Sequence, residues 1–174
     1  RLLLPEDGDY EEARQLWNGM IDRSPAMIVR SAGTSDVIAS VNLARERDLL
    51  LSIRGGGHNV AGSAVADGGL VIDLSEMNGV VVDPDIPVAH VEGGARLGDL
   101  DHETQVFGLA TPLGVVSRTG VAGLTLGGGY GWLTRKYGLS CDNLLSADVV
   151  TADGQLVRAS PTRGSGPRAA GAPT

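Results

Sequence analysis

Apolar residues at helical spacing mark the start of the chain. Asp9 and Glu12 are spaced as a capping box, and four apolar residues follow them on one helical face. This pattern predicts a helix over residues 10–20.

A strand, a helix and a second strand are predicted next. A short apolar strand is expected over 26–29, and Thr34 or Ser35 is expected to cap an amphipathic helix. Residues 49–53 form a continuous apolar run, which is typical of a parallel strand buried on both faces. The order predicts a β-α-β unit with a parallel pair of strands, and this unit leads directly into residues 54–59.

The remaining predicted elements are short. Asp83-Pro84-Asp85 is a turn signal between two apolar runs, and Asp153-Gly154 marks the clearest hairpin of the sequence. One helix is expected over 96–104. The strands are expected over residues 70–74, 80–82, 88–91, 147–151 and 155–158.

Glycine stands out in the composition, because the 174 residues include 26 glycines, about twice the usual share. Six of them lie in residues 54–69 and nine in residues 108–138. They have no three-residue period, which excludes collagen. The clustering indicates two loops in which small residues are required.

Charge and the other residue types exclude several classes of protein. The net charge of −7 argues against nucleic acid as the main partner. No apolar run approaches the ~18 residues of a membrane span, and no signal peptide is visible, so we expect no membrane partner and a cytoplasmic location. The single cysteine excludes a disulfide framework. The hydrophobic share of 42% excludes a disordered chain.

The first glycine cluster comes directly after a predicted strand and ends on a histidine. Three consecutive glycines permit positive φ and a close approach of the backbone, as a pyrophosphate group requires. The spacing is neither that of a Walker A loop nor that of a Rossmann fingerprint, so a tight turn between two strands is an equally good interpretation. The candidate residues here are Arg54, Gly55, Gly56, Gly57, His58, Asn59, Gly62 and Ser63.

Taken singly, the histidines and the cysteine do not indicate a reactive site. A lone histidine such as His58 is more often a structural hydrogen-bonding residue. His90 and His102 show no metal-ligand spacing and are expected at the surface or in hydrogen bonds. Cys141 is expected to be a small buried hydrophobic residue. We therefore expect no metal site.

The second glycine cluster, residues 114–131, has no sustained helical or strand period. Small residues let a loop and a short helix press their backbone against a flat ligand. An ordinary packing loop is the alternative, although a long irregular segment in a compact domain usually has a function. Two such loops in one chain fit a large phosphorylated cofactor better than a small metabolite.

Five motifs then occur in a specific order along the chain. They are Arg-Gly-Gly-Gly-His-Asn at 54–59, Gly-Leu-Val-Ile-Asp-Leu-Ser at 69–75, the second glycine cluster, Arg-Lys-Tyr-Gly-Leu at 135–139 and Asp142-Asn143. Over about residues 26–158 this set resembles the FAD-binding domain of the berberine-bridge-enzyme-like flavin oxidases, which have the vanillyl-alcohol-oxidase (PCMH-type) fold.

The resemblance implies a fold and a division of the chain. The fold class is α+β, an incomplete PCMH-type FAD-binding fold over residues 25–160. An N-terminal β-α-β lobe is expected over about 25–80 and a mixed or antiparallel lobe over about 81–160. Residues 1–24 form a helical lead-in.

The resemblance also implies FAD as the cofactor. Residues 54–59 would hold its pyrophosphate through backbone amides, and His58 would form a single covalent bond to the 8α-methyl carbon of the isoalloxazine ring. Val150 would contact the adenine side through its backbone. The residues expected to wrap the adenosine and flavin edges are Gly114, Val115, Thr119, Gly120, Gly123, Leu124, Gly127, Gly128 and Gly131.

Two departures from the family pattern narrow these expectations. Val116 stands where some relatives carry a cysteine that forms a second flavin bond, so at most one bond is implied. Leu124 replaces a histidine of some relatives, so no polar contact to the flavin is expected from it. No residue corresponds to the family's catalytic base, and the catalytic residues stay unassigned.

The function implied by the resemblance is oxidation of a small organic substrate by hydride transfer to covalently bound FAD, with dioxygen as acceptor. A non-catalytic flavin-binding module, an inactive truncated fragment and nucleotide binding without flavin are the alternatives. Residues 161–174 contain only Pro, Thr, Arg, Gly, Ser and Ala, which predicts disorder. A shifted reading frame permits a sequence close to the family's continuation there, so we expect this segment to be out of frame.

Overall fold

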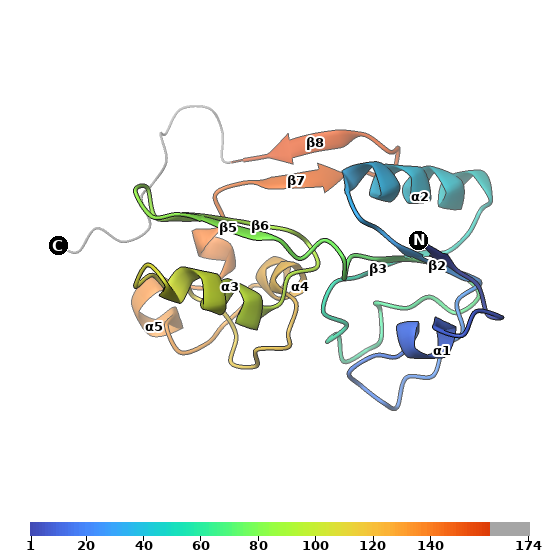
Figure 1. The fold of residues 1–174 in the computed structure, drawn as a ribbon, viewed down its shortest axis with the longest axis horizontal. Helices are drawn as coiled ribbons and strands as arrows, with labels where there is room; N and C mark the ends of the chain where they lie inside the picture. Colours follow the sequence, from blue (N-terminus) through green and yellow to red (C-terminus); the bar gives the residue numbers. More distant parts are fainter. Residues whose placement is uncertain (161–174) are drawn as a thin grey trace.

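A four-stranded sheet forms the centre of the N-terminal half of the molecule (Figure 1). The structure is a computed structural model and describes residues 1–160. The strands lie in the order β1-β2-β4-β3, with β1 antiparallel to β2 and both β2 and β3 parallel to β4. Their bounds are Leu2–Leu3 for β1, Met27–Arg30 for β2, Leu51–Arg54 for β3 and Leu70–Asp73 for β4.

Helix α2, Thr34–Glu46, covers one face of this sheet, and the N-terminal segment covers the other (Figure 1). Leu70 and Ile72 of β4 pack with residues of α2. Val71, between them, belongs to a second cluster with the N-terminal Leu3 and Tyr10. Successive residues of a strand point to opposite faces, so all four residues of β4 are buried.

The predicted β-α-β unit is present, but its two strands are not neighbours. Strand β4 lies between β2 and β3, and the predicted direct pairing is therefore wrong. The prediction that residues 49–53 are buried on both faces is also wrong, because β3 is an edge strand and Ile53 is 56% exposed. The strand buried on both faces is β4, which has a neighbour on each side.

The helix predicted over residues 10–20 is wrong in its length. Helix α1 covers Tyr10–Ala13 only, and the side chain of Asp9 makes no cap hydrogen bond. The chain then leaves the helical path: the N–H of Trp17 donates to the Gly57 carbonyl over 3.3 Å, and Arg14 Nη1 donates to the Arg23 carbonyl over 3.1 Å. The bond from the Trp17 N–H to the loop at Gly57 takes the place of a hydrogen bond that would have continued the helix.

Helix α2 is placed as predicted, but its N-cap is Gly33 instead of Thr34 or Ser35. No side chain caps the first turn. The carboxylate of Asp36 instead accepts the N–H of Ala32 over 2.9 Å, which fixes the chain before the helix. An acidic residue in the first turn also stabilises the positive end of the helix dipole.

The second half of the chain contains two antiparallel strand pairs, as predicted. Strands β5 (Val80–Asp83) and β6 (Val88–Val91) pair with each other, and β7 (Ala147–Val150) pairs with β8 (Leu156–Ala159). In Figure 1 the β5–β6 pair lies between the β7–β8 hairpin and the helices α3 and α4. The helical elements are α3 at Leu97–Gln105, α4 at Val121–Leu126, α5 at Thr134–Tyr137 and a short 3₁₀ turn at Cys141–Asn143.

Helix α3 builds the core of this half. Leu97 and Leu100 point inward as predicted and pack with Leu113 and Leu124. Cys141 is exposed, so its predicted burial is wrong. It lies in the 3₁₀ turn Cys141–Asn143, none of whose residues is buried. The predicted disorder and shifted frame of residues 161–174 lie outside the described residues.

Candidate cofactor-binding site

The two glycine clusters meet in space through their backbones. A Cβ atom added at Gly56 would lie 2.2 Å from the backbone nitrogen of Gly120, and one added at Gly120 would lie 2.4 Å from the backbone nitrogen of Gly56. No side chain fits at either position. These two glycines are therefore required for packing of one loop on the other, a role that the sequence did not reveal.

The start of α3 holds the second cluster in place. The N–H groups of Leu97 and Gly98 donate to the carbonyls of Thr119 and Ser117, both over 2.9 Å. The N–H of Val121 donates to the Ala95 carbonyl, also over 2.9 Å. These bonds explain why an irregular segment has one defined path beside the first loop.

Other glycines of the second cluster fill structural positions. A Cβ at Gly131 would lie 1.8 Å from the Leu113 carbonyl oxygen, and one at Gly114 would lie 2.5 Å from Leu124 Cδ1. Gly123 is different, because it lies inside α4 and a Cβ there would meet nothing within 4 Å. The fold therefore does not require glycine at position 123.

Charged residues gather at the carboxyl ends of the parallel strands. The register places Arg30, Asp73 and Arg54 side by side at the ends of β2, β4 and β3. Arg30 Nε lies 3.5 Å from Asp73 Oδ2, and Asp73 is only 1% exposed. Ligands of open parallel sheets bind at this edge. Arg54 was predicted as a site residue, whereas Arg30 and Asp73 were not, although their positions at the ends of predicted strands were a usable signal.

Arg54 is a partly buried member of this cluster. Burial lowers the pKa of its guanidinium, and nearby Arg30 and Arg96 lower it further, while Asp73 opposes them. Arg54 Nη1 donates to the Ala13 carbonyl. Arg30 Nε is buried without a hydrogen-bond partner among the described residues. Arg30 and Arg96 therefore both lie close enough to Arg54 to act on its charge, and Asp73 is the one carboxylate that opposes them there.

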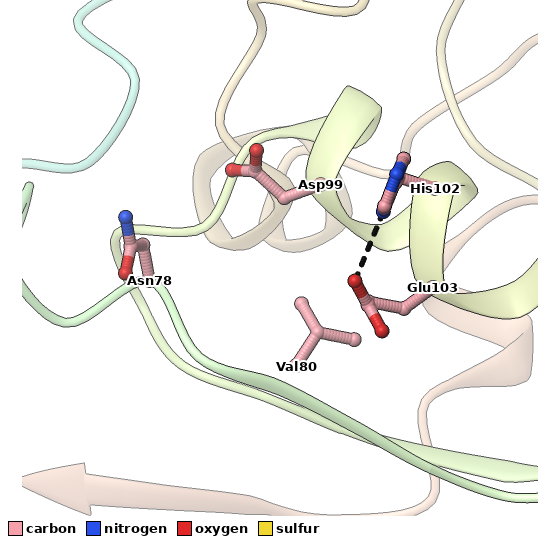
Figure 2. A pocket seen from close by; sticks show the side chains of 5 residues that line it. All are labelled: Asn78, Val80, Asp99, His102 and Glu103. Atoms are coloured by element: carbon pink, nitrogen blue, oxygen red, sulfur yellow. Dashed lines mark hydrogen bonds and ion pairs between the residues drawn. The ribbon is translucent and has the colours of Figure 1, made fainter.

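A surface depression of about 220 Å³ lies next to this cluster. Its lining joins the first glycine loop to the start of α3 and consists of Gly55, Ser75, Asn78, Gly94, Arg96 and Asp99. A second depression, of about 240 Å³, shares Asn78 and Asp99 with it (Figure 2). Figure 2 shows that Glu103 and His102 lie together there, and their side chains are 3.0 Å apart. Two carboxylates line this second depression, whereas the first has one carboxylate, Asp99, and the guanidinium of Arg96, so the first suits an anion better.

His58 follows the glycine triplet and is partly buried. Its ring stacks on the Trp17 indole, with ring centroids 5.1 Å apart and an interplanar angle of 20°. Burial lowers the pKa of the imidazole, and the charge of Arg96 lowers it further, so both favour the neutral ring. Trp17 was assigned to a predicted helix and was missed as a site residue.

The structure places the remaining predicted site residues as follows. Asn59 Oδ1 accepts the N–H of Ser63 over 3.1 Å, which closes the first loop. Gly62 has φ +75°, a conformation that favours glycine. Val150 lies in β7 and packs into the core cluster beneath α2. Val115 of the second cluster is exposed, whereas Leu124 packs into the core around α3.

Residues 25–160 match the sequence family described as FAD binding domain. The match covers most of the chain, and the protein belongs to this family. The crystal structure of 6-hydroxy-D-nicotine oxidase from Arthrobacter nicotinovorans superposes with a TM-score of 0.91 at 40% sequence identity, over 92% of this chain and 35% of that one. The predicted PCMH-type α+β fold is thereby confirmed.

Named oxidases are also similar in sequence. (R)-6-hydroxynicotine oxidase of Paenarthrobacter nicotinovorans is 40% identical over 90% of this chain and 34% of its own length. Glucooligosaccharide oxidase of Sarocladium strictum is 38% identical over 88% of this chain and 32% of its own length. The chain therefore spans about a third of the length of these relatives, and it corresponds to their FAD-binding part.

Between residues 1 and 160, no group of three or more histidine, cysteine, aspartate or glutamate side chains is arranged to hold a metal ion. In the same residues, no helix has the length and apolar character needed to cross a membrane.

Proposed function

We propose that this chain binds FAD with the pyrophosphate beside the first glycine loop and that His58 carries the flavin through one covalent bond. The charges at the loop support the placement of the pyrophosphate. Arg30 and Arg96 both act on the charge of Arg54, and within residues 1–160 Arg30 Nε has no hydrogen-bond partner. A diphosphate would supply both acceptor oxygens and negative charge at this point.

The state of His58 supports the covalent bond. A neutral imidazole has a lone pair available for attack, and burial favours that form of His58. An imidazole nitrogen of His58 would bond to the 8α-methyl carbon, and the imidazole N–H and one methyl C–H would be lost. FAD would supply the acceptor for the two electrons and two protons released, and dioxygen would be their final acceptor, giving hydrogen peroxide.

We further propose that the protein is an oxidoreductase of small organic molecules, with dioxygen as acceptor. FAD supplies a two-electron acceptor for the hydride of a substrate C–H bond. The chain's own residues bind and orient that group. The named relatives are oxidases of a hydroxynicotine and of glucooligosaccharides, so their names do not select one substrate class. Single attachment, the cytoplasmic location and the acceptor stay predictions.

His58→Ala is expected to abolish covalent flavin. The wild-type chain is incubated with FAD, denatured and separated on a gel, and flavin fluorescence at the position of the polypeptide is measured. His90→Ala is the matched control, because His90 is exposed and is expected to leave the fluorescence unchanged. Fluorescence retained by His58→Ala, or absent from the wild-type chain, contradicts the covalent bond. ADP binding by a chain that retains no flavin would favour nucleotide binding without flavin.

Gly123→Ala separates the needs of the fold from those of the cofactor. In the chain without FAD, the change is expected to raise the free energy of unfolding by up to about 1 kcal/mol, because alanine is the better helix former. In the presence of FAD, affinity is expected to fall about tenfold, since a methyl group inserted into a filled contact costs roughly 1–3 kcal/mol. Urea titration and fluorescence titration with FAD measure the two effects. Unchanged affinity would show that FAD does not contact Gly123.

A further inference from the structure

The segment after α1 is hydrogen-bonded to the loop that carries His58, on both sides of the histidine in the sequence. The N–H of Trp17 donates to the Gly57 carbonyl over 3.3 Å, and Asn18 Nδ2 donates to the Val60 carbonyl over 2.8 Å. Gly57 and Val60 flank His58 in the sequence. The two bonds therefore fix the backbone immediately before the histidine and shortly after it.

The same segment also contacts the loop further along, at residues 62 and 65. Arg23 Nη1 donates to the carbonyls of Gly62 and Val65, over 2.7 and 3.0 Å. A Cβ added at Gly62 would lie 2.7 Å from Ile21 Cγ2, so these two segments are in close contact. We refer to residues 16–23 as the strap. It joins the N-terminal segment to a loop that lies far from it in the sequence.

Trp17 is the residue of the strap that faces the His58 ring. It is 62% exposed and belongs to none of the three core clusters described above, so the core does not depend on its indole. Its ring contact is the stack on His58, at 5.1 Å and 20°. Stacking uses the faces of two rings and leaves their edges accessible. Both imidazole nitrogens are edge atoms.

We propose that Trp17 is a positioning residue for the attachment of FAD to His58. Its indole holds the plane of the imidazole in one orientation, so that a ring nitrogen is presented from the end of the glycine loop. An unstacked imidazole would rotate about its side-chain bonds, and only a fraction of its orientations would direct a nitrogen at the carbon to be attacked. This inference rests on the proposed covalent bond through His58.

The stack itself is tested on the 174-residue chain without FAD. The His58 ring protons are assigned by comparison with His58→Ala, and their NMR shifts are measured in the wild type, Trp17→Ala and Trp17→Phe. We expect the indole ring current to displace these resonances in the wild type, Trp17→Ala to remove the displacement and Trp17→Phe to retain part of it. Unchanged His58 resonances in Trp17→Ala overturn the proposal, whatever the rate of FAD attachment.

The positioning role is tested by the rate of covalent attachment. Each variant is incubated with excess FAD, and gel fluorescence after denaturation is followed over time. Trp17→Ala is expected to slow attachment on the order of 10–100-fold, as displacement of a reacting group does, and Trp17→Phe is expected to restore most of the rate. Met20→Ala, on the same strap and with an 86% exposed residue, is the matched control and is expected to match the wild type.

The outcomes distinguish the two proposals. A wild-type rate in Trp17→Ala, with no fluorescence in His58→Ala, overturns the positioning role and leaves the covalent bond standing. Fluorescence in His58→Ala overturns the covalent bond and the positioning role with it.

Circular dichroism of Trp17→Ala shows whether the fold is retained. If the fold is lost, Asn18→Asp replaces it, because this change removes the donor to Val60 and keeps the acceptor for the Met20 N–H. Asn18 is the neighbour of Trp17, and its bond to Val60 holds this part of the strap on the loop. A wild-type rate in Asn18→Asp then overturns the positioning role of Trp17.

Discussion

Gly56→Ala is expected to lower the free energy of unfolding by about 3 kcal/mol or more and to abolish FAD binding. The added Cβ would lie 2.2 Å from the backbone nitrogen of Gly120 and 2.7 Å from its Cα. Both obstructing atoms belong to the main chain, so no side chain can rotate away. Overpacking of this kind costs roughly 1–3 kcal/mol, and more where the backbone itself must move.

Urea unfolding of the chain and titration with FAD measure the two effects of Gly56→Ala. Gly8→Ala is the matched control, because a Cβ at Gly8 meets nothing within 4 Å and the expected change is within about 0.5 kcal/mol. Gly120→Ala is expected to reproduce the effect of Gly56→Ala, since each glycine obstructs the other. An unchanged unfolding midpoint in Gly56→Ala would show that the two loops do not pack together in solution.

Asp73→Asn is expected to have opposite effects on stability and on anion binding. Asp73 is buried and lies 3.5 Å from Arg30 Nε, and its Oδ1 accepts the N–H of Ser75 over 3.1 Å. Asparagine keeps the size and the acceptor oxygen but removes the charge. Breaking a buried ion pair costs roughly 3–5 kcal/mol, and the partial exposure of Arg30 places the expected loss at about 3 kcal/mol or less.

The same change increases the positive charge that faces a bound anion. ADP, which contains the diphosphate without the flavin, is therefore expected to bind several-fold more tightly to Asp73→Asn than to the wild type, and the gain is expected to shrink at high salt. Isothermal titration calorimetry at low and high salt measures this effect, and urea unfolding measures the loss of stability. Asp148→Asn, an exposed carboxylate on β7, is the control. Weaker ADP binding in Asp73→Asn would contradict a diphosphate site beside the three arginines.

Local patterns predicted much of the secondary structure. The amphipathic helix α2, the strand β4, both strand pairs of the second half and the inward face of α3 follow from residue spacing and turn signals, which act over a few neighbouring residues. The prediction of a helix over 10–20 was wrong because it relied on local spacing alone. Its spacing is helical, but Trp17 and Asn18 find hydrogen-bond partners on the loop around His58, and these tertiary contacts outweigh a weak local preference.

The sequence by itself determined the family, the α+β fold and the two glycine clusters as candidate cofactor loops. Only the tertiary structure showed that Gly56 and Gly120 must both be glycine because their backbones are in close contact, whereas Gly123 has open space around it. It also assembled Arg30, Asp73 and Arg96 around the first loop and placed Trp17 on the His58 ring. The physical reason is that these groups are far apart in the sequence. Strand order and loop packing bring them together, and no local periodicity records either one.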